Sequence, residues 1–162
     1  MGDMEIDDRL TIRLADIDDV VTIAEFNTRL AAETEGKQLV PATITDGVRT
    51  LLTDGRHGRY FVACLGTRIV GQMMHTGEWS DWRNGYFWWI QSVYVYADFR
   101  RQGVFQNLFR HVESEAKADP QVIGIRLYVE DENHPAHATY EKMGLVWTTY
   151  RVMERYPLNG SS

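Results

Sequence analysis

The stretch from Ile90 to Phe109, IQSVYVYADFRRQGVFQNLF, decides how the rest of this chain is organised. Up to Tyr96 it is rich in β-branched and aromatic residues, which is typical of a strand. After Gly103 the apolar residues recur at helical spacing, so a helix should begin there. The turn between them holds a glycine and two arginines, and it can gather unpaired amide N–H groups and positive charge around an anion such as phosphate. The same residues also fit an ordinary turn with solvated arginines.

Before this stretch the sequence predicts a strand, two helices and a hairpin. Asp16 is a good N-cap, because its carboxylate can accept hydrogen bonds from the first turn of a helix. Gly66-Thr67 is a two-residue turn of the Gly-first hairpin type. The predicted elements are strand Leu10–Leu14, helices Asp16–Glu33 and Thr45–Leu52, and strands Arg59–Leu65, Arg68–His75 and Gly85–Tyr96. The last three strands should form an antiparallel meander, with Glu78 to Asn84 as a loop.

After this stretch the sequence predicts a further strand, helix and strand. The helix that follows Gly103 should end near Asp119. Val122 to Val129 is nearly all apolar, as expected for a strand covered on both faces and parallel to the third meander strand. Asn133 can cap a helix that ends at Gly144, and Leu145 to Tyr156 alternates like a last strand. These elements define an α/β protein with a mixed, mostly antiparallel sheet of about six or seven strands and about four helices.

Composition indicates a single soluble domain, 1–162, with its core at about residues 10–156. The net charge is -6 and no long basic block is present, which argues against a nucleic-acid partner. No apolar stretch approaches membrane-spanning length and no leader pattern is visible, so a cytoplasmic protein without a membrane partner is expected. The one cysteine, Cys64, lies in an apolar run and should be a buried thiol, and no metal is expected.

Two motifs in this order resemble those of the GNAT superfamily of acyl-CoA-dependent N-acyltransferases. The family's cofactor signature is Gln or Arg, two variable residues, Gly, one variable residue, then Gly or Ala. The chain matches it with RRQGVF from Arg100 to Phe105, except that Phe105 replaces the small residue. Downstream, ENHPAHATYEKMGLV resembles the family's second pattern, which is carried here by Asn133, Ala136, Tyr140 and Gly144. The resemblance covers Thr11 to about Arg155.

The resemblance implies that acetyl-CoA is the cosubstrate. The N–H groups of Gln102, Gly103, Val104 and Phe105 would hold its pyrophosphate, with charge from Arg100 and Arg101. Gly103 would let the backbone approach the phosphates, and the Phe105 ring is expected to turn into the core. The family grips the thioester with a strand bulge, matched here by Val93, Tyr94 and Val95, where the parallel strands should diverge after Val95. Asn133 would reach the same arm of the cofactor.

For catalysis, the resemblance makes Tyr140 the general acid that protonates the departing thiolate. The alternative for Tyr140 is a core tyrosine that fills a helix face. Some family members carry a glutamate base at the position of Trp89, so this role does not carry over. Glu78 is the first substitute and His75 the second, either through a water molecule, and a free amine with a lowered pKa would need no base.

The acceptor would be a primary amine of a small molecule or a peptide. In the family its pocket is built from the first helices, the loop before the third strand and the last strands, which supply Glu33, Trp79 and Trp82 here. Carboxylates beside aromatic rings suit a cationic amine, although the tryptophans could equally be packing residues. The expected activity is N-acetyltransfer by direct attack in a ternary complex, and the alternative is a non-catalytic acyl-CoA-binding or regulatory module. An exposed last strand could also serve a homodimer.

Overall fold

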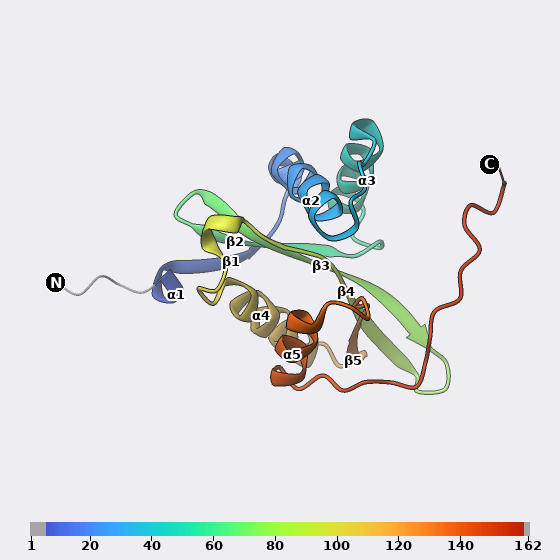
Figure 1. The fold of residues 1–162 in the computed structure, drawn as a ribbon. Coiled ribbons are helices and arrows are strands. Elements are labelled where there is room, and N and C mark those ends of the chain that lie inside the picture. Colours follow the sequence, from blue (N-terminus) through green and yellow to red (C-terminus); the bar gives the residue numbers. More distant parts are fainter. Residues whose placement is uncertain (1–5, 161–162) are drawn as a thin grey trace. The chain divides into compact units, whose positions relative to one another are not determined.

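The structure is a computed structural model that describes residues 6–160. The chain divides into two compact units between Tyr128 and Val129. Within the described residues, the first unit holds one five-stranded sheet in the order β1-β2-β3-β4-β5 (Figure 1). Its strands are β1 (Leu10–Leu14), β2 (Arg59–Leu65), β3 (Arg68–Ser80), β4 (Gly85–Val95) and β5 (Val122–Leu127). Neighbouring strands from β1 to β4 are antiparallel, and β4 and β5 are parallel.

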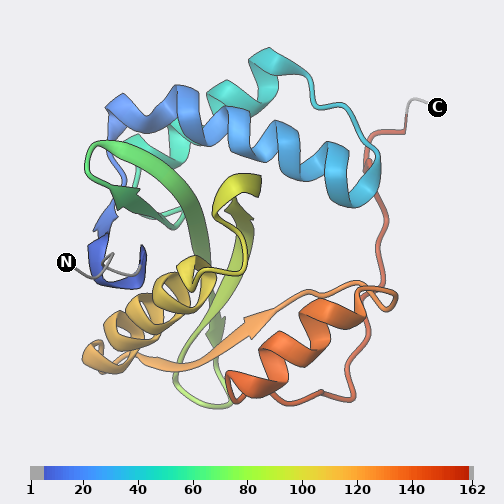
Figure 2. The ribbon, with the colours of Figure 1, turned by 60° about the vertical axis from the view of Figure 1, so that its left-hand side comes forward.

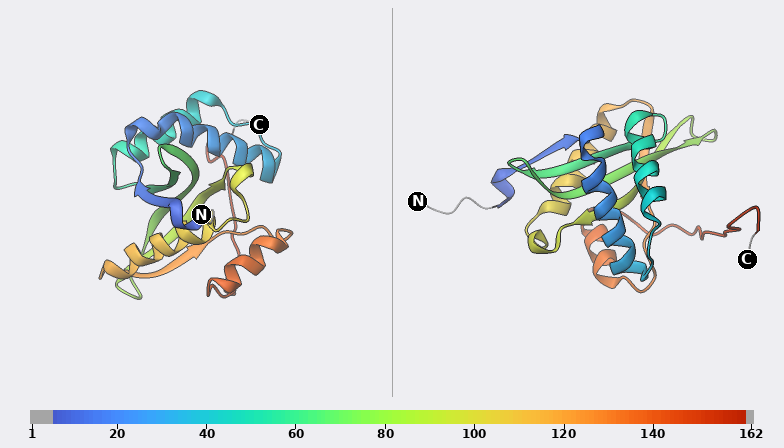
Figure 3. Two further views of the ribbon diagram at one scale, coloured as in Figure 1. Left: turned by 90° about the vertical axis from the view of Figure 1, so that its left-hand side faces the viewer. Right: turned by 90° about the horizontal axis from the view of Figure 1, so that it is seen from above.

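Helices cover both faces of this sheet. Two of them, α2 (Val20–Glu35) and α3 (Pro41–Thr53), lie on one face, and α4 (Val104–Ala118) lies on the other (Figures 2 and 3). Shorter turns are α1 (Ile6–Arg9), η1 (Ile17–Asp19) and η2 (Ala97–Phe99). As the sequence predicts, Asp16 is an N-cap: its Oδ1 accepts from Asp18 N at 2.9 Å at the start of η1, which runs directly into α2. The second helix begins at Pro41, earlier than predicted, because the fixed φ of proline suits the first helical position.

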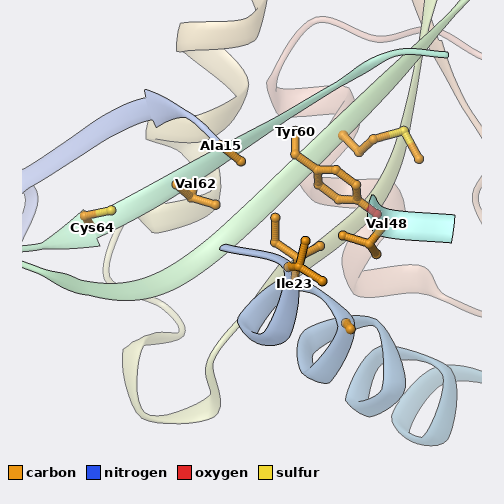
Figure 4. Packing of buried hydrophobic residues seen from close by; sticks show 9 residues of the cluster. Ala15, Ile23, Val48, Tyr60, Val62 and Cys64 are labelled. Atoms are coloured by element: carbon orange, nitrogen blue, oxygen red, sulfur yellow. The ribbon is translucent and has the colours of Figure 1, made fainter. Parts of the chain in front are cut away.

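The core between the sheet and the α2–α3 face is aliphatic and aromatic. Ile23 of α2 and Val48 of α3 pack onto Tyr60, Val62 and Cys64 of β2 (Figure 4). Every β2 residue from Tyr60 to Cys64 is buried, because the strand is central and both of its faces are covered. Burial of side chains of this size contributes about 1.5 to 3 kcal/mol each before the cost of ordering the chain.

The β3–β4 hairpin is longer than the sequence predicts. Residues 76–80 continue β3 and pair with β4 as far as Ser80 and Gly85, so the expected loop is reduced to a tight turn. The Trp79 and Tyr86 rings meet edge to face across the two strands at 4.9 Å, a cross-strand contact that stabilises the added pairs. Asn84 takes a left-handed φ of 50° in the turn, a conformation that asparagine tolerates well.

The second unit contains α5 (His134–Lys142) with its N-cap at Asn133, as predicted. The predicted last strand at Leu145 to Tyr156 is wrong: no strand forms there in the described part of the chain, and the sheet has five strands instead of six or seven. Alternating apolar residues make a strand only when a partner supplies hydrogen bonds and a covered face. The side chains of Val146, Val152 and Met153 are largely exposed instead. The strand on which a homodimer was expected is therefore not formed.

Candidate active site

The parallel strands β4 and β5 separate partway along β4. Their last paired residues are Ile90 and Leu127, whereas β4 continues to Val95. The divergence therefore comes after Ile90, five residues earlier than the sequence suggested. From Gln91 to Val95 the β4 edge that faces away from β3 has no strand partner in the described residues. An unpaired strand edge presents N–H and C=O groups that can pair with an amide-rich ligand.

A bulge interrupts β4 on the same segment. Gln72 of β3 is opposite Tyr94, whereas Met74 is opposite Gln91, so two β4 residues face the single residue between them. One of these two is Ser92, which has a left-handed φ of 51°. A bulge of this kind bends the strand and changes the direction of its main-chain groups. The bulge consists of Ser92 and Val93, so it overlaps the predicted stretch Val93 to Val95 at Val93.

The start of α4 follows this edge after the short turn η2. The N-cap is Gly103, with a left-handed φ of 85° that glycine adopts without strain. The N–H groups of a first helical turn have no acceptor within the helix, which makes this end suitable for an anion. Val104 is buried and packs near Gly71 of β3, where an added Cβ would lie 2.8 Å from Val104 Cγ1. The helix start is therefore held firmly against the sheet.

The two arginines of the turn have different surroundings. Arg100 forms an ion pair with Glu33 of α2 at 2.6 Å, and its Nε donates to the carbonyl of Val95 at 2.9 Å. Glu33 also accepts from the Tyr94 hydroxyl at 3.2 Å, and burial followed by the charge of Glu33 raises the pKa of Tyr94. The side chain of Arg101 is exposed, and its backbone has a left-handed φ of 62°. Glu33 thus lies beside the predicted cofactor turn.

The cofactor motif also includes Gln102 of the turn and Phe105 of α4. Gln102 Nε2 donates to the carbonyl of Asp98 at 3.0 Å, which ties the turn to η2. The half-buried Phe105 ring lies 6.0 Å from the ring of Phe109, one helical turn further along α4. Phe105, which stands where the family motif has Gly or Ala, thus packs along the helix.

The residues predicted for the base and the acceptor do not form one cluster. Glu78 accepts from Arg126 Nη1 at 2.9 Å and from Trp89 Nε1 at 3.2 Å, so both of its oxygens are engaged. Trp79 is the next residue of β3, so its side chain points to the opposite face of the sheet. Trp82 lies in the hairpin turn and is 86% exposed. Glu33 is distant in sequence, on α2 beside Arg100.

His75, the second base candidate, is buried on the α4 face of the sheet. Its ring stacks on Trp88 at 3.7 Å and lies 6.1 Å from the Phe61 ring. Among residues 6–160, neither of its ring nitrogens finds a hydrogen-bond partner. Burial, and then the charge of Arg59, lowers the pKa of His75 to about 4. A neutral imidazole enclosed between rings is a structural group here, not an accessible base.

This burial predicts a loss of stability in mild acid. The unfolded chain binds a proton on His75 at a higher pH than the folded chain does, so the free energy of unfolding should fall as the pH drops from about 6.5 to about 4. The contribution is about 3 kcal/mol. Urea unfolding of His75→Phe, which keeps a ring in the stack, should show a weaker pH dependence over this range than the wild-type protein. Equal slopes in both proteins would contradict the assignment.

Cys64 lies on β2 inside the α2–α3 core and is 3% exposed. Burial raises the pKa of its thiol, so it is a poor nucleophile at neutral pH. In the part of the chain that the structure describes, no three His, Cys, Asp or Glu side chains gather as metal ligands. No helix between residues 6 and 160 is long and apolar enough to cross a bilayer.

In the second unit, the predicted motif residues lie on and around α5. Asn133 Oδ1 accepts from Ala136 N at 3.3 Å and caps the helix. Gly144 follows the helix with a left-handed φ of 92°. Tyr140 is half-buried, and burial raises the pKa of its hydroxyl. A hydroxyl with a raised pKa stays protonated at neutral pH and can donate a proton.

Sequence reasoning missed two buried polar residues near the bulge, Asn27 and Gln72. Each had a visible signal, since Asn27 follows Phe26 on the apolar side of α2 and Gln72 interrupts the apolar run IVGQMM. A polar residue inside an apolar run needs a hydrogen-bond partner when it is buried. The sequence alone does not say which partner that is.

Residues 23–145 match the acetyltransferase (GNAT) family. Because this match spans most of the chain, the protein belongs to that family of acyltransferases. An N-alpha-acetyltransferase of Saccharolobus solfataricus is 29% identical over 110 residues, which are 62% of this chain and 63% of that protein. The chain therefore spans less than two thirds of that relative.

Solved structures agree on the fold. A possible acetyltransferase from Clostridium difficile 630 is 47% identical with a TM-score of 0.87, covering 92% of this chain and 98% of that one. A predicted acetyltransferase from Clostridium acetobutylicum with acetyl-CoA is 18% identical with a TM-score of 0.74, covering 90% and 96%. An aminoglycoside acetyltransferase from a soil metagenome, in complex with sisomicin, is 17% identical with a TM-score of 0.76, covering 95% and 99%. The predicted fold class and family are confirmed.

Proposed function

We propose that this protein is an N-acetyltransferase that uses acetyl-CoA to acetylate a primary amine by direct attack in a ternary complex. The observation that carries the proposal is the bulged edge of β4, which has no strand partner among the described residues and is followed by η2 and then by the helix start at Gly103. The family match crosses the division between Tyr128 and Val129, which supports one acetyltransferase domain built from both units.

The first unit has features that fit the pyrophosphate and the pantetheine arm of acetyl-CoA. The pyrophosphate would lie at the N–H groups of Gln102, Gly103, Val104 and Phe105, where the helix end and the exposed Arg101 favour negative charge. Arg100, whose guanidinium is paired with Glu33, would add a second positive charge beside the pyrophosphate. The amides of the pantetheine arm would pair with the β4 edge at Val93 and at the N–H of Val95, because the Val95 carbonyl already accepts from Arg100 Nε; Tyr94 stays paired with Gln72 of β3. In the second unit, Asn133 is the proposed contact to this arm.

Acetyl-CoA supplies an acyl group that is activated as a thioester. Tyr140 is the proposed general acid. Because burial raises its pKa, the hydroxyl stays protonated and can donate its proton to the departing sulfur. The acceptor amine must be neutral to attack. Glu78 is the proposed base, acting through water, although the hydrogen bonds from Arg126 and Trp89 engage both of its oxygens. An acceptor that is already deprotonated needs no such base.

The acceptor is proposed to be a primary amine of a small molecule or a peptide, and Glu33, Trp79 and Trp82 are its proposed contacts. The comparison with an N-alpha-acetyltransferase supports a peptide amine, and the fold shared with an aminoglycoside acetyltransferase supports a small polyamine-like molecule. Because these side chains do not form one cluster, each would act by itself: Glu33 would hold either cation through charge, and Trp79 or Trp82 through cation–π contact.

A panel assay tests this function. Purified protein with acetyl-CoA should release free CoA in the presence of at least one amine from a panel of peptides with free N-termini, polyamines and aminoglycosides. Binding of acetyl-CoA in calorimetry without CoA release from any amine would favour the alternative, a non-catalytic acyl-CoA-binding module. One observation favours this alternative: both oxygens of Glu78, the proposed base, already accept hydrogen bonds from Arg126 and Trp89.

A further inference from the structure

A buried chain of polar side chains leads from α2 to the bulge of β4. Asn27 of α2 donates from Nδ2 to the Tyr60 hydroxyl at 2.9 Å, and its Oδ1 accepts from Gln72 Nε2 at 3.1 Å. The same Nε2 donates to the backbone carbonyl of Ser92, also at 3.1 Å. Gln72 is fully buried, and Asn27 and Tyr60 are nearly so. We refer to Tyr60, Asn27 and Gln72 as the buried polar chain.

The buried polar chain ends at Ser92, the strained residue of the bulge. Ser92 has a φ of 51°, in a region that non-glycine residues occupy only when the surrounding structure holds them there. The register of β3 and β4 shifts at this point, between the Gln72–Tyr94 and Met74–Gln91 pairs. The side-chain amide of Gln72 supplies a hydrogen bond to the Ser92 carbonyl where the ladder is irregular. The buried polar chain therefore links the bulge to both α2 and β2.

Gln72 provides this link at a cost in stability. Its Oε1 is buried and has no hydrogen-bond partner within residues 6–160. A buried acceptor without a partner is unfavourable, and an apolar side chain of similar size would avoid that loss. The two hydrogen bonds that Nε2 donates, to Asn27 and to Ser92, are what such a side chain could not make.

We infer that Gln72 is a positioning residue for acyl transfer: it fixes the bulge at Ser92 and so sets how the edge from Val93 to Val95 meets the acyl thioester. This inference rests on the proposed function. The helix start at Gly103 lies on the other face of the sheet, where Val104 packs near Gly71, so the contacts to the CoA pyrophosphate should depend little on Gln72. Both compounds carry the pantetheine arm, and only acetyl-CoA should also lose a contact at its thioester carbonyl. A change at Gln72 should therefore affect acetyl-CoA more than CoA.

Gln72→Met removes both donated hydrogen bonds at similar side-chain length. Hydrogen–deuterium exchange of the backbone amides of residues 91–95 should become faster than in the wild-type protein, because the bulge loses its tether. In calorimetry the Kd for acetyl-CoA should rise roughly fivefold more than the Kd for CoA, as for one lost hydrogen bond at the thioester carbonyl. Tyr60→Phe keeps the Gln72–Ser92 bond and should give a smaller change in the same direction, which also covers the case in which Gln72→Met folds poorly.

Val112→Ala is the matched control, because Val112 is almost fully buried on α4, on the other face of the sheet from Gln72. It should lower the melting temperature without changing the ratio of the two dissociation constants. Equal exchange rates in Gln72→Met and Val112→Ala, or an equal loss of affinity for acetyl-CoA and CoA in Gln72→Met, would overturn the inference. A wild-type protein that binds neither compound would instead overturn the proposed function, and the exchange rates would still decide whether Gln72 holds the bulge.

Discussion

Replacing Tyr140 with phenylalanine should lower kcat by about 100-fold, the scale of a lost general acid. The change removes one hydroxyl and leaves the ring, so the packing of α5 should persist. The Kd for CoA should stay nearly unchanged, because the proposed phosphate contacts lie at the start of α4. Burial raises the pKa of Tyr140, so the wild-type hydroxyl should remain a proton donor through neutral pH and above. The measurement is steady-state CoA release with the best amine of the panel.

Tyr156→Phe is a suitable control for this experiment. Tyr156 is 84% exposed in the same unit of the chain and carries no proposed role. Its loss should leave kcat unchanged. Turnover by Tyr140→Phe at the wild-type rate would remove Tyr140 from the mechanism and return it to the role of a packing residue.

Gly103→Val should weaken CoA binding by at least about tenfold. The φ of 85° at Gly103 is strained for any side chain and most of all for a β-branched one. The new side chain also stands at the helix start where the pyrophosphate is proposed to bind. Calorimetry with CoA alone gives the dissociation constant without the need for an acceptor amine.

Gly66→Val provides the comparison for strain alone. Gly66 has a φ of 59° in the β2–β3 hairpin turn, and an added Cβ there would meet no atom within 4 Å. Both variants should lose stability, because both force a valine into the left-handed region. Only Gly103→Val should lose CoA affinity. If the two variants bind CoA equally well, the start of α4 is not the pyrophosphate site.

Local patterns predicted most elements of the fold. The bounds of β1 and β2 agree with the prediction, because each is a short run of strand-forming residues with clear ends at Asp16 and Gly66. The Asn133 cap and the start of α4 after Gly103 agree for the same reason: capping and left-handed turns depend on the few residues at the site. Longer elements were less well bounded. The extension of β3 depends on contacts with β4 that lie outside the local sequence.

The predicted last strand shows the limit of such patterns. Leu145 to Tyr156 alternates as a strand should, yet the pattern states only which side chains could share a face. Pairing needs a neighbouring strand at the correct distance and direction, which depends on the tertiary structure. Similarly, the position of Glu33 in the sequence suggested a helix end near the acceptor, and only the structure pairs it with Arg100.

By itself, the sequence determined the order of the elements from β1 to α5, the glycine-led turn before α4 and the two motifs that indicate the family. These features depend on the conformational preferences of neighbouring residues, which are visible in one dimension. Tertiary structure decided where β4 leaves β5, how Ser92 is held by Gln72, and which oxygens of Glu78 are already engaged. Those contacts join residues far apart in the chain. Each is fixed by the packing of whole elements, so a local pattern could not specify it.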